Sequence, residues 1–518
     1  MARNTRIEGG TSGFGGLAAR LPVLPTLLLL ALVVRLVAWS GTTLMWNDGP
    51  DFLWQARQFL DGRPLLAVDH QYHPLYGAAV ALVSPLFGDL TDAAAAVSML
   101  GGLLAVVAVW WSARRLLPTS PGVAALAGAL AAIHPKLVAF SSDVLSDGLF
   151  LGLAALAVAV MASAARSGRR APWAAAGALA ALAYLTRVEG LALLLLPGLW
   201  CLAGLRRRAT LAPRLGAALL FAVCWIVVAS PYAHAIHELT GQWGLSTHPH
   251  FAHMGVPGSA EARPGHPDSP IASPQLGERR EYWEPDEARP AGRALWLVAG
   301  ATVGAFRAEL LLLGLAGALF LLRDPARRPA LLAALALAAA FFAAATRQGM
   351  SGWSLSDRYL MLPVVVLLPV VAEGWRRAWN APRGRLALRV LLVLSVVHML
   401  LLSTAPKREH HRARLAALAW VAEHSAPDEA IVVRRRRDGW YAGRPVILGG
   451  PPYDEAQLLA AMRAHRGAFV VLTAERVEQR EPAWLGPDGA LRVVERFTEA
   501  GAETVLVLAP SDRALAPR

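Results

Sequence analysis

Residues 21–40, LPVLPTLLLLALVVRLVAWS, form the first long apolar stretch of this chain, and they decide its fold class. About 20 consecutive apolar residues are enough to cross the hydrocarbon core of a bilayer as a helix. The stretch follows a short basic leader, residues 1–20, and no small-residue cleavage site ends it. We therefore expect a retained signal-anchor helix, with the amino terminus on the cytoplasmic side.

The composition points the same way. Of the 518 residues 55% are hydrophobic and only 17% are charged, whereas soluble domains carry about 25% charged residues. The net charge of +13 raises the possibility of a nucleic-acid partner. The arginines, however, cluster in short connectors between apolar stretches, which is the pattern of cytoplasmic loops in membrane proteins. The sequence thus predicts a multi-pass membrane protein and no nucleic-acid binding.

Eleven segments are predicted to cross the membrane. They are residues 21–41, 92–112, 121–139, 147–165, 172–186, 190–205, 215–232, 301–322, 329–346, 358–374 and 387–404. This order places the basic connectors in the cytoplasm, and it places a first outer loop, 42–91, and a long outer loop, 233–300, on the opposite side. Residues 73–88 are apolar but short, so they are expected to form a juxtamembrane or re-entrant helix.

From residue 405 the pattern changes to short alternating strands and helices. The strand-like segments AIVVRR, RPVILG, AFVVLTA, LRVVERF and ETVLVLA surround the helical segment YDEAQLLAAMRAHRG. The fold class is therefore an all-α polytopic membrane domain, residues 21–404, with a small extracytoplasmic α/β domain, residues 405–518. The run RRRR at 434–437 is interpreted either as a solvated strand end or as a contact for anionic lipid head groups.

Several ionisable residues are expected at one membrane face, the outer one. They are Asp48, Asp51, Asp143, Asp147, Arg187, Glu189 and Arg358. Ionisable side chains at membrane depth are costly and usually functional. A carboxylate can serve as a general base or hold a divalent metal, and an arginine can bind a phosphate through paired donors. The alternative is that each acid is an ordinary solvated loop residue.

Several motifs along the chain resemble one known superfamily. The motifs are NDGPDFLWQARQFLDG, HQYHPLYGAAVALVSPLFG, SSDVLSDGLFLGLAAL, LAYLTRVEGLALLLLPG and SDRYLMLPVVVLLPVVA. Their order resembles the GT-C superfamily of membrane glycosyltransferases, in the bacterial branch similar to protein O-mannosyltransferases and lipid A aminoarabinose transferases. The carboxy-terminal segments AWVAEHSAPDEAIVV and GWYAGRPVI resemble the periplasmic domain of that branch, so the likeness covers most of the chain.

The resemblance implies an inverting transfer of a hexosyl or pentosyl group from a polyprenyl-phosphate donor. The acceptor would be a hydroxyl of a protein, a lipid or a polysaccharide at the outer face of the cytoplasmic membrane. Asp48 stands where the family has its first-loop catalytic aspartate, and Asp51, one helical turn further on, is the candidate for a second acid. Arg358, followed by Tyr359, is the expected phosphate ligand.

The remaining candidates are weaker signals. Asp147 either orients the acceptor or a metal, or caps the helix that it begins. Arg187 and Glu189 either bind substrate or pair with each other, and Asp143, His73 and Tyr76 are candidate substrate contacts. The histidine segment HPHFAH, 248–253, has spacing that a metal could use. No cofactor is implied with certainty, and a divalent metal stays open.

A second class of function competes with the enzyme. A lipid-phosphate transporter or flippase would also need many spans and a phosphate site. Transporters usually contain internal repeats and polar groups near the bilayer midplane. In this sequence the acids gather at one interface and no repeat is evident, which favours the transferase. A third possibility is a sensor whose outer domain binds a partner.

Overall fold

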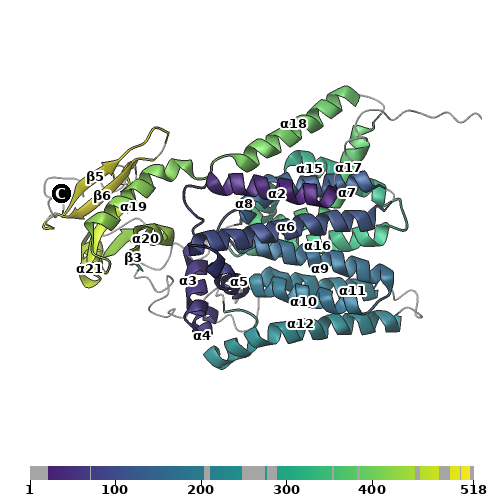
Figure 1. Ribbon diagram of the computed structural model, residues 1–518, viewed down its shortest axis with the longest axis horizontal. Helices are drawn as coiled ribbons and strands as arrows, with labels where there is room; N and C mark the ends of the chain where they lie inside the picture. The colour runs from purple at the N-terminus through teal and green to yellow at the C-terminus, as the bar shows by residue number, and fades with distance from the viewer. Residues whose placement is uncertain are drawn as a thin grey trace, which may run out of the picture.

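The chain folds into a long helical body with a small sheet domain at one end (Figure 1). This computed structural model describes residues 22–69, 72–118, 120–202, 211–247, 275–276, 289–352, 355–381, 385–449, 455–475, 477, 490–501 and 503–513. The expected leader, 1–20, and the histidine segment, 248–253, lie outside the described residues.

The first half of the helical body begins with the expected anchor helix and short helices at the site end. The elements are α2 (Val23–Ser40), α3 (Gly49–Leu60), α4 (Pro64–Val68), α5 (Leu75–Val83), η1 (Ser84–Leu86), α6 (Leu90–Leu116), α7 (Pro121–Ile133), α8 (Pro135–Ser141), α9 (Asp147–Ser167), α10 (Ala171–Thr186), η2 (Val188–Leu194), α11 (Leu195–Leu202) and α12 (Leu211–Thr240). Helix α5 has nine residues, about 14 Å at 1.5 Å per residue, which is too short to cross a bilayer.

The second half of the body begins near the end of the segment predicted as the long outer loop, 233–300. Its elements are α14 (Ala291–Phe306), α15 (Ala308–Leu321), α16 (Arg328–Met350), η6 (Asp357–Leu360), α17 (Met361–Trp379) and α18 (Arg385–Thr404). Within the described residues, seven helices are long and apolar enough to cross a membrane, or nine if each of two bent pairs counts as one span. The polytopic helical fold is confirmed, while the count of eleven spans stays a prediction.

Two of the expected spans are bent by more than 40°. The segment expected at 301–322 is interrupted at Arg307, where φ is 72° and the helices on either side meet at 91°. The segment expected at 121–139 bends by 56° after His134. Pro135 explains this second break, because its ring lacks an N–H and clashes with the preceding turn. Neither break was predicted, because the average hydropathy of a long segment stays high across a few polar residues.

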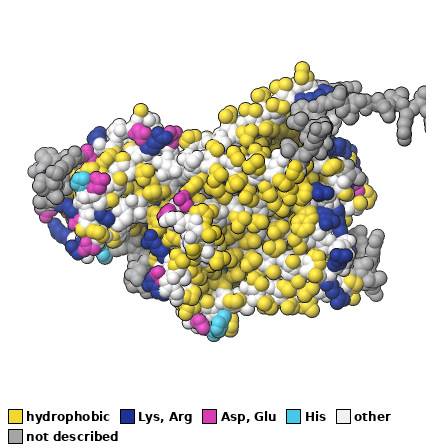
Figure 2. Space-filling view, viewed as in Figure 1, with side chains coloured by type: hydrophobic (Ala, Val, Ile, Leu, Met, Phe, Trp, Pro, Cys, Tyr) yellow, Lys and Arg dark blue, Asp and Glu magenta, His cyan; other side chains and the backbone are white. Residues whose placement is uncertain are grey.

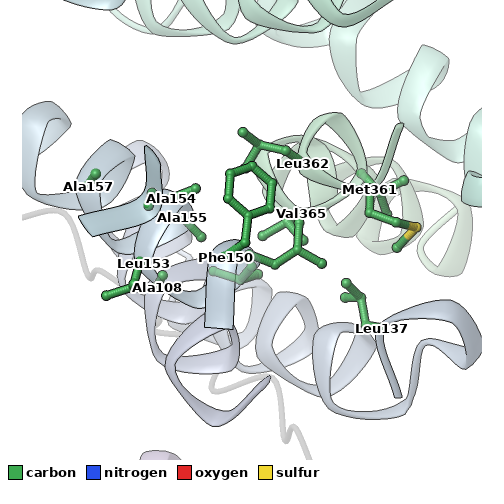
Figure 3. Close-up of a cluster of buried hydrophobic side chains, with 14 of the residues drawn as sticks. Ala108, Leu137, Phe150, Leu153, Ala154, Ala155, Ala157, Met361, Leu362 and Val365 are labelled. Carbon is green, nitrogen blue, oxygen red and sulfur yellow. The ribbon is translucent and has the colours of Figure 1, made fainter. Parts of the chain in front are cut away.

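Close helix contacts fix the centre of the body. A Cβ atom on Gly101 of α6 would lie 2.3 Å from the Gly148 backbone, so α6 and α9 approach as closely as only glycine permits. On the other side of α9, Phe150 lies beside Leu362 and Val365 of α17 in a buried apolar cluster (Figure 3). These contacts set the position of the first turn of α9, where Asp147 lies.

The two ends of the body differ in charge. Basic side chains occupy the last turns of α6, α9 and α17, and they include Arg114, Arg166 and Arg376. Figure 2 shows Lys and Arg gathered at the end of the body away from the sheet domain, with a broad apolar surface between. The start of α9, with Asp147, therefore lies at the opposite end from these basic turns.

The carboxy-terminal domain confirms the predicted α/β pattern. Its elements are η7 (Glu409–His411), α19 (Arg412–His424), β2 (Ala430–Val433), α20 (Arg436–Ala442), β3 (Val446–Gly449), α21 (Glu455–Ala464), β4 (Gly467–Thr473), β5 (Leu491–Phe497) and β6 (Val505–Pro510). The six-stranded sheet has the order β1-β3-β2-β4-β6-β5, in which β1 is the pair Gln275–Leu276 from the long outer loop. Strands β1, β3, β2 and β4 are parallel, whereas β6 is antiparallel to β4 and β5.

The run RRRR at 434–437 differs from both sequence-based interpretations. Arg434 is exposed, but Arg436 and Arg437 begin α20 and are buried. Helix α20 faces α3 of the membrane domain (Figure 1). Half of the run is therefore part of an interface within the chain and is not a solvated strand end.

Candidate functional site

Asp48 and Arg358 meet at the end of the body that carries the sheet domain. Asp48 is the residue before α3, and its carboxylate makes no capping hydrogen bond to that helix. Instead its Oδ2 accepts a hydrogen bond of 2.9 Å from Nη1 of Arg358 in η6. With 17% of its side chain exposed, Asp48 stays open to a substrate. The expected base and the expected phosphate ligand are thus direct neighbours.

Asp147 joins Arg358 to a second arginine. Its Oδ1 lies 3.2 Å from Nη1 of Arg187, and its Oδ2 lies 3.4 Å from Nη2 of Arg358. Ser146 stands at the capping position of α9 without a side-chain capping bond. The Asp147 carboxylate, only 4% exposed, is directed to the two guanidinium groups. This geometry favours the site role of Asp147 over the helix-cap role.

Arg187 completes a row of alternating charges. It follows α10, and its Nη2 donates a 2.6 Å hydrogen bond to Oε1 of Glu189. Its guanidinium also lies over the ring of Tyr359, 6.0 Å from the centroid. The pairing expected for Arg187 and Glu189 is therefore present, and the pair is connected to the rest of the site through Asp147. We call Asp48, Arg358, Asp147, Arg187 and Glu189 the charge row.

Asp51 and Asp143 lie outside the charge row. Asp51 is in the first turn of α3, and its Oδ2 lies 3.2 Å from Nη1 of Arg436 in α20. Asp143 accepts a hydrogen bond from Arg408, which follows α18, and its Oδ1 accepts the backbone N–H of Trp46 at 3.1 Å. Both acids hold the first outer loop to other parts of the chain.

His73 and Tyr76 are buried in packing around the site. Burial lowers the pKa of His73 to about 4, so its ring is neutral. Its Nδ1–H donates to the Tyr184 carbonyl at 2.6 Å, and its Nε2 lies 3.2 Å from the Ser246 hydroxyl. The Tyr76 hydroxyl donates to the Ala94 carbonyl at 2.8 Å. These contacts are internal, and the structure does not bring either residue into the charge row.

Tyr72 was missed by sequence reasoning although it lies beside the site. Burial, and then the charges of Asp48 and Asp51, raise the pKa of its hydroxyl well above 10. Its ring packs on Phe52 of α3, with centroids 4.8 Å apart. The only available signal was its position just before the His73-Pro74 pair.

The charge row combines carboxylates, which can accept a proton, with arginines, which can bind a phosphate. Two guanidinium groups share three carboxylates, so each arginine retains donors that an incoming anion can use. Asp48 and Glu189 are more exposed than Asp147, with 17%, 16% and 4% of their side chains exposed. Among the described residues, no group of three or more His, Cys, Asp or Glu side chains is arranged to hold a metal ion.

Comparisons with known proteins agree with this fold. Residues 69–234 match the family of dolichyl-phosphate-mannose-protein mannosyltransferases. The structure resembles ArnT from Cupriavidus metallidurans, solved bound to undecaprenyl phosphate, with a TM-score of 0.59 and 17% identity over 93% of this chain and 97% of that chain. No curated protein matches the chain.

Two further solved structures share the fold over less of their own length. The oligosaccharyltransferase of Archaeoglobus fulgidus has a TM-score of 0.55 and 14% identity over 88% of this chain and 69% of that chain. The mycobacterial arabinofuranosyltransferase AftD has a TM-score of 0.50 and 15% identity over 95% of this chain and 40% of that chain. The predicted resemblance to the GT-C superfamily is thereby confirmed, at the level of the fold and of the matched segment.

Proposed function

We propose that this protein is an inverting glycosyltransferase that uses a polyprenyl-phosphate-linked sugar. The observation that carries the proposal is the contact between Asp48 and Arg358, which places a candidate base beside a candidate phosphate ligand. The resemblance to a transferase that was solved with undecaprenyl phosphate supports the donor class. The sugar is a hexosyl or pentosyl group, and a divalent metal is not required by this mechanism.

Asp48 acts as the general base in the proposed reaction. Its carboxylate takes the proton of the acceptor hydroxyl as the oxygen attacks the anomeric carbon. The bond from that carbon to the donor phosphate breaks, and the electron pair leaves with the polyprenyl phosphate. Attack from the face opposite to the leaving group inverts the configuration. Asp51 is the reserve candidate, but its pairing with Arg436 and its 2% exposure favour Asp48.

Arg358 and Arg187 stabilise the leaving phosphate in this mechanism. Charge that develops on the leaving oxygen is best stabilised by donors fixed before the reaction begins. Asp147 contacts both guanidinium groups, so it holds them in place without the cost of ordering them at each turnover. Tyr359 lines the same region beside Arg187.

The site is proposed to face the outside of the cytoplasmic membrane. The basic last turns of α6, α9 and α17 lie at the far end of the body and fit a cytoplasmic face. The sheet domain lies at the other end beside α3, which Asp48 directly precedes (Figure 1). Sugar transfer would thus take place beside an extracytoplasmic carboxy-terminal domain, on an acceptor that is a protein, a lipid or a polysaccharide.

A transfer assay separates this proposal from its alternative, a lipid-phosphate flippase. Purified full-length protein in lipid nanodiscs is incubated with radiolabelled polyprenyl-phosphate sugars and a cell-envelope fraction as acceptor. The proposal expects label on an acceptor together with release of polyprenyl phosphate. In parallel vesicles, movement of labelled lipid between leaflets without any transfer would overturn the proposal in favour of the flippase.

A further inference from the structure

The turn between α2 and α3 is held by side chains from distant parts of the chain. Leu44 and Met45 are fully buried, and the turn leads directly to Asp48. Buried backbone N–H and C=O groups outside a helix or sheet need partners. Three consecutive residues of this turn, 44–46, obtain theirs from side chains that lie at least 97 positions away in the sequence.

Two of these partners are Arg408, in the segment after α18, and Asp143, in the segment between α8 and α9. Arg408 Nε, just after α18, donates to the Leu44 carbonyl at 2.6 Å. The Trp46 N–H donates to Oδ1 of Asp143 at 3.1 Å. Arg408 and Asp143 also bond to each other, so one ion pair holds two points of the turn.

The other two partners belong to α20 of the carboxy-terminal domain. The Met45 N–H donates to the Tyr441 hydroxyl at 2.9 Å, and the Met45 carbonyl accepts from Nη1 of Arg437 at 3.1 Å. Both backbone groups of Met45, three residues before Asp48, are thus bound by one short helix. Arg57 of α3 also stacks over the ring of Trp440 at 4.6 Å.

Burying the guanidinium of Arg437 at this position lowers the stability of the fold. Its side chain is 2% exposed, and burial lowers its pKa to about 10. Within the described part of the chain its Nε and Nη2 have no hydrogen-bond partner. A buried guanidinium that is only partly satisfied destabilises a fold, and an apolar side chain of similar size would generally pack there at lower cost. Its hydrogen bond to the Met45 carbonyl provides a reason for an arginine at this position, because it holds the backbone of the turn.

We infer that α20 is a positioning element for the site, and that Arg437 and Tyr441 hold the turn 44–46 so that Asp48 meets Arg358. The inference rests on the proposed function, because it assigns to the carboxy-terminal domain a role in that reaction. Neither side chain touches the charge row, so both act through the backbone that carries Asp48. The carboxy-terminal domain is then part of the catalytic unit.

Two substitutions test the inference in the full-length protein. Tyr441→Phe removes only the hydroxyl that accepts the Met45 N–H, and Arg437→Met removes the charge but keeps much of the volume. We expect kcat to fall about tenfold for Tyr441→Phe and on the order of thirtyfold for Arg437→Met, with the donor KM unchanged. Arg434→Met, an exposed position of the same arginine run, serves as the control with wild-type kcat.

Two further readouts separate positioning from general destabilisation. Hydrogen exchange of residues 42–48 should rise in Tyr441→Phe, while the exchange of β2 and β4 stays at the wild-type level. In the same variant the loss of kcat should exceed the loss of stability that thermal unfolding measures, because a general destabilisation would lower both together.

Wild-type kcat in both variants, or unchanged exchange at 42–48, would overturn the inference. A wild-type protein that transfers no sugar would instead overturn the proposed function. In that case the exchange measurement still reports whether α20 holds the turn, so the two failures are distinguishable.

Discussion

Asp147 and Arg358 lie 3.4 Å apart although α9 and η6 are separated by about 200 residues of sequence, and the same carboxylate lies 3.2 Å from Arg187. One buried acid therefore holds two guanidinium groups in a shared orientation. Because Asp48 contacts the same Arg358, the whole charge row depends on Asp147.

Asp147→Asn should greatly reduce transfer. The substitution keeps the shape but removes the charge that orients both arginines, and breaking a buried pair from one side costs about 3–5 kcal/mol of stability. We expect at least a hundredfold loss of kcat/KM, because stabilisation of the leaving phosphate is lost. Asp92→Asn, at an exposed position in the first turn of α6, is the control. Near-normal turnover of Asp147→Asn would contradict the role given to the charge row.

Arg358→Lys and Arg358→Gln test the phosphate ligand. Lysine keeps the charge but lacks the paired planar donors of arginine, so we expect a raised KM for the donor and partial activity. Glutamine removes the charge and should abolish transfer. Donor titration of both variants measures this, with Arg63→Gln in the first outer loop as the control. Equal donor KM in all three variants and the wild type would exclude Arg358 from donor binding.

Gly148→Ala tests the contact that positions Asp147. An added Cβ would lie 2.5 Å from the Ser98 carbonyl oxygen of α6. We expect α9 to shift, a loss of about 1–3 kcal/mol of stability from overpacking, and a drop in transfer larger than the loss of stability explains. Thermal unfolding and transfer are compared with Gly122→Ala, where the added Cβ would meet nothing within 4 Å. Wild-type behaviour of Gly148→Ala would show that α6 and α9 can separate freely.

A fourth prediction concerns the stability of the carboxy-terminal domain in acid. Burial tends to raise the pKa of Glu503, but hydrogen bonds from His411 and Arg414 outweigh it and lower this pKa to about 2. Burial also lowers the pKa of His411 from 6.5, although Glu503 partly opposes this. Neutral His411 with its hydrogen on Nδ1 donates to Glu503 at 2.7 Å, and its Nε2 accepts from Arg435 at 3.4 Å.

Both lowered pKa values make the folded protein less stable in acid. The unfolded chain binds a proton at each group more readily than the folded chain, so stability falls as the pH drops below 6.5 and falls further between 4.5 and 2. In calorimetry, Glu503→Gln should remove the pH dependence of the lower window, whereas Glu423→Gln on the exposed face of α19 should not. An unchanged acid profile in Glu503→Gln would contradict this assignment.

Much of the fold could be predicted because hydropathy and alternation are local properties. The anchor helix α2, the long helices α6 and α9, and the strands β2 to β6 all appear where their patterns indicated. The break at Arg307 was missed, because one arginine hardly changes the hydropathy of a long apolar segment. Helix α20 was not predicted, because its arginines were interpreted as the charged end of a strand. Their burial depends on tertiary contacts with α3, which the sequence does not show.

The members of the charge row were predicted, but of their pairings only that of Arg187 with Glu189 was anticipated. Topology placed Asp48, Asp147 and Arg358 on one face, because each lies at the same end of its span. Which acid meets which arginine depends on distances of a few ångströms between helices, which no sequence pattern specifies. The ion pair between Asp51 and Arg436 could not be predicted for the same reason, because 385 positions separate the two residues.

The most direct test of the account is the transfer activity of Asp48→Asn. The purified variant is compared in nanodiscs with wild type and with Asp61→Asn, whose target is a half-exposed acid of the same loop that pairs with Arg63. The account predicts that Asp48→Asn remains folded and binds the labelled donor but transfers no sugar, while Asp61→Asn transfers at the wild-type rate. Wild-type turnover by Asp48→Asn would contradict the central claim.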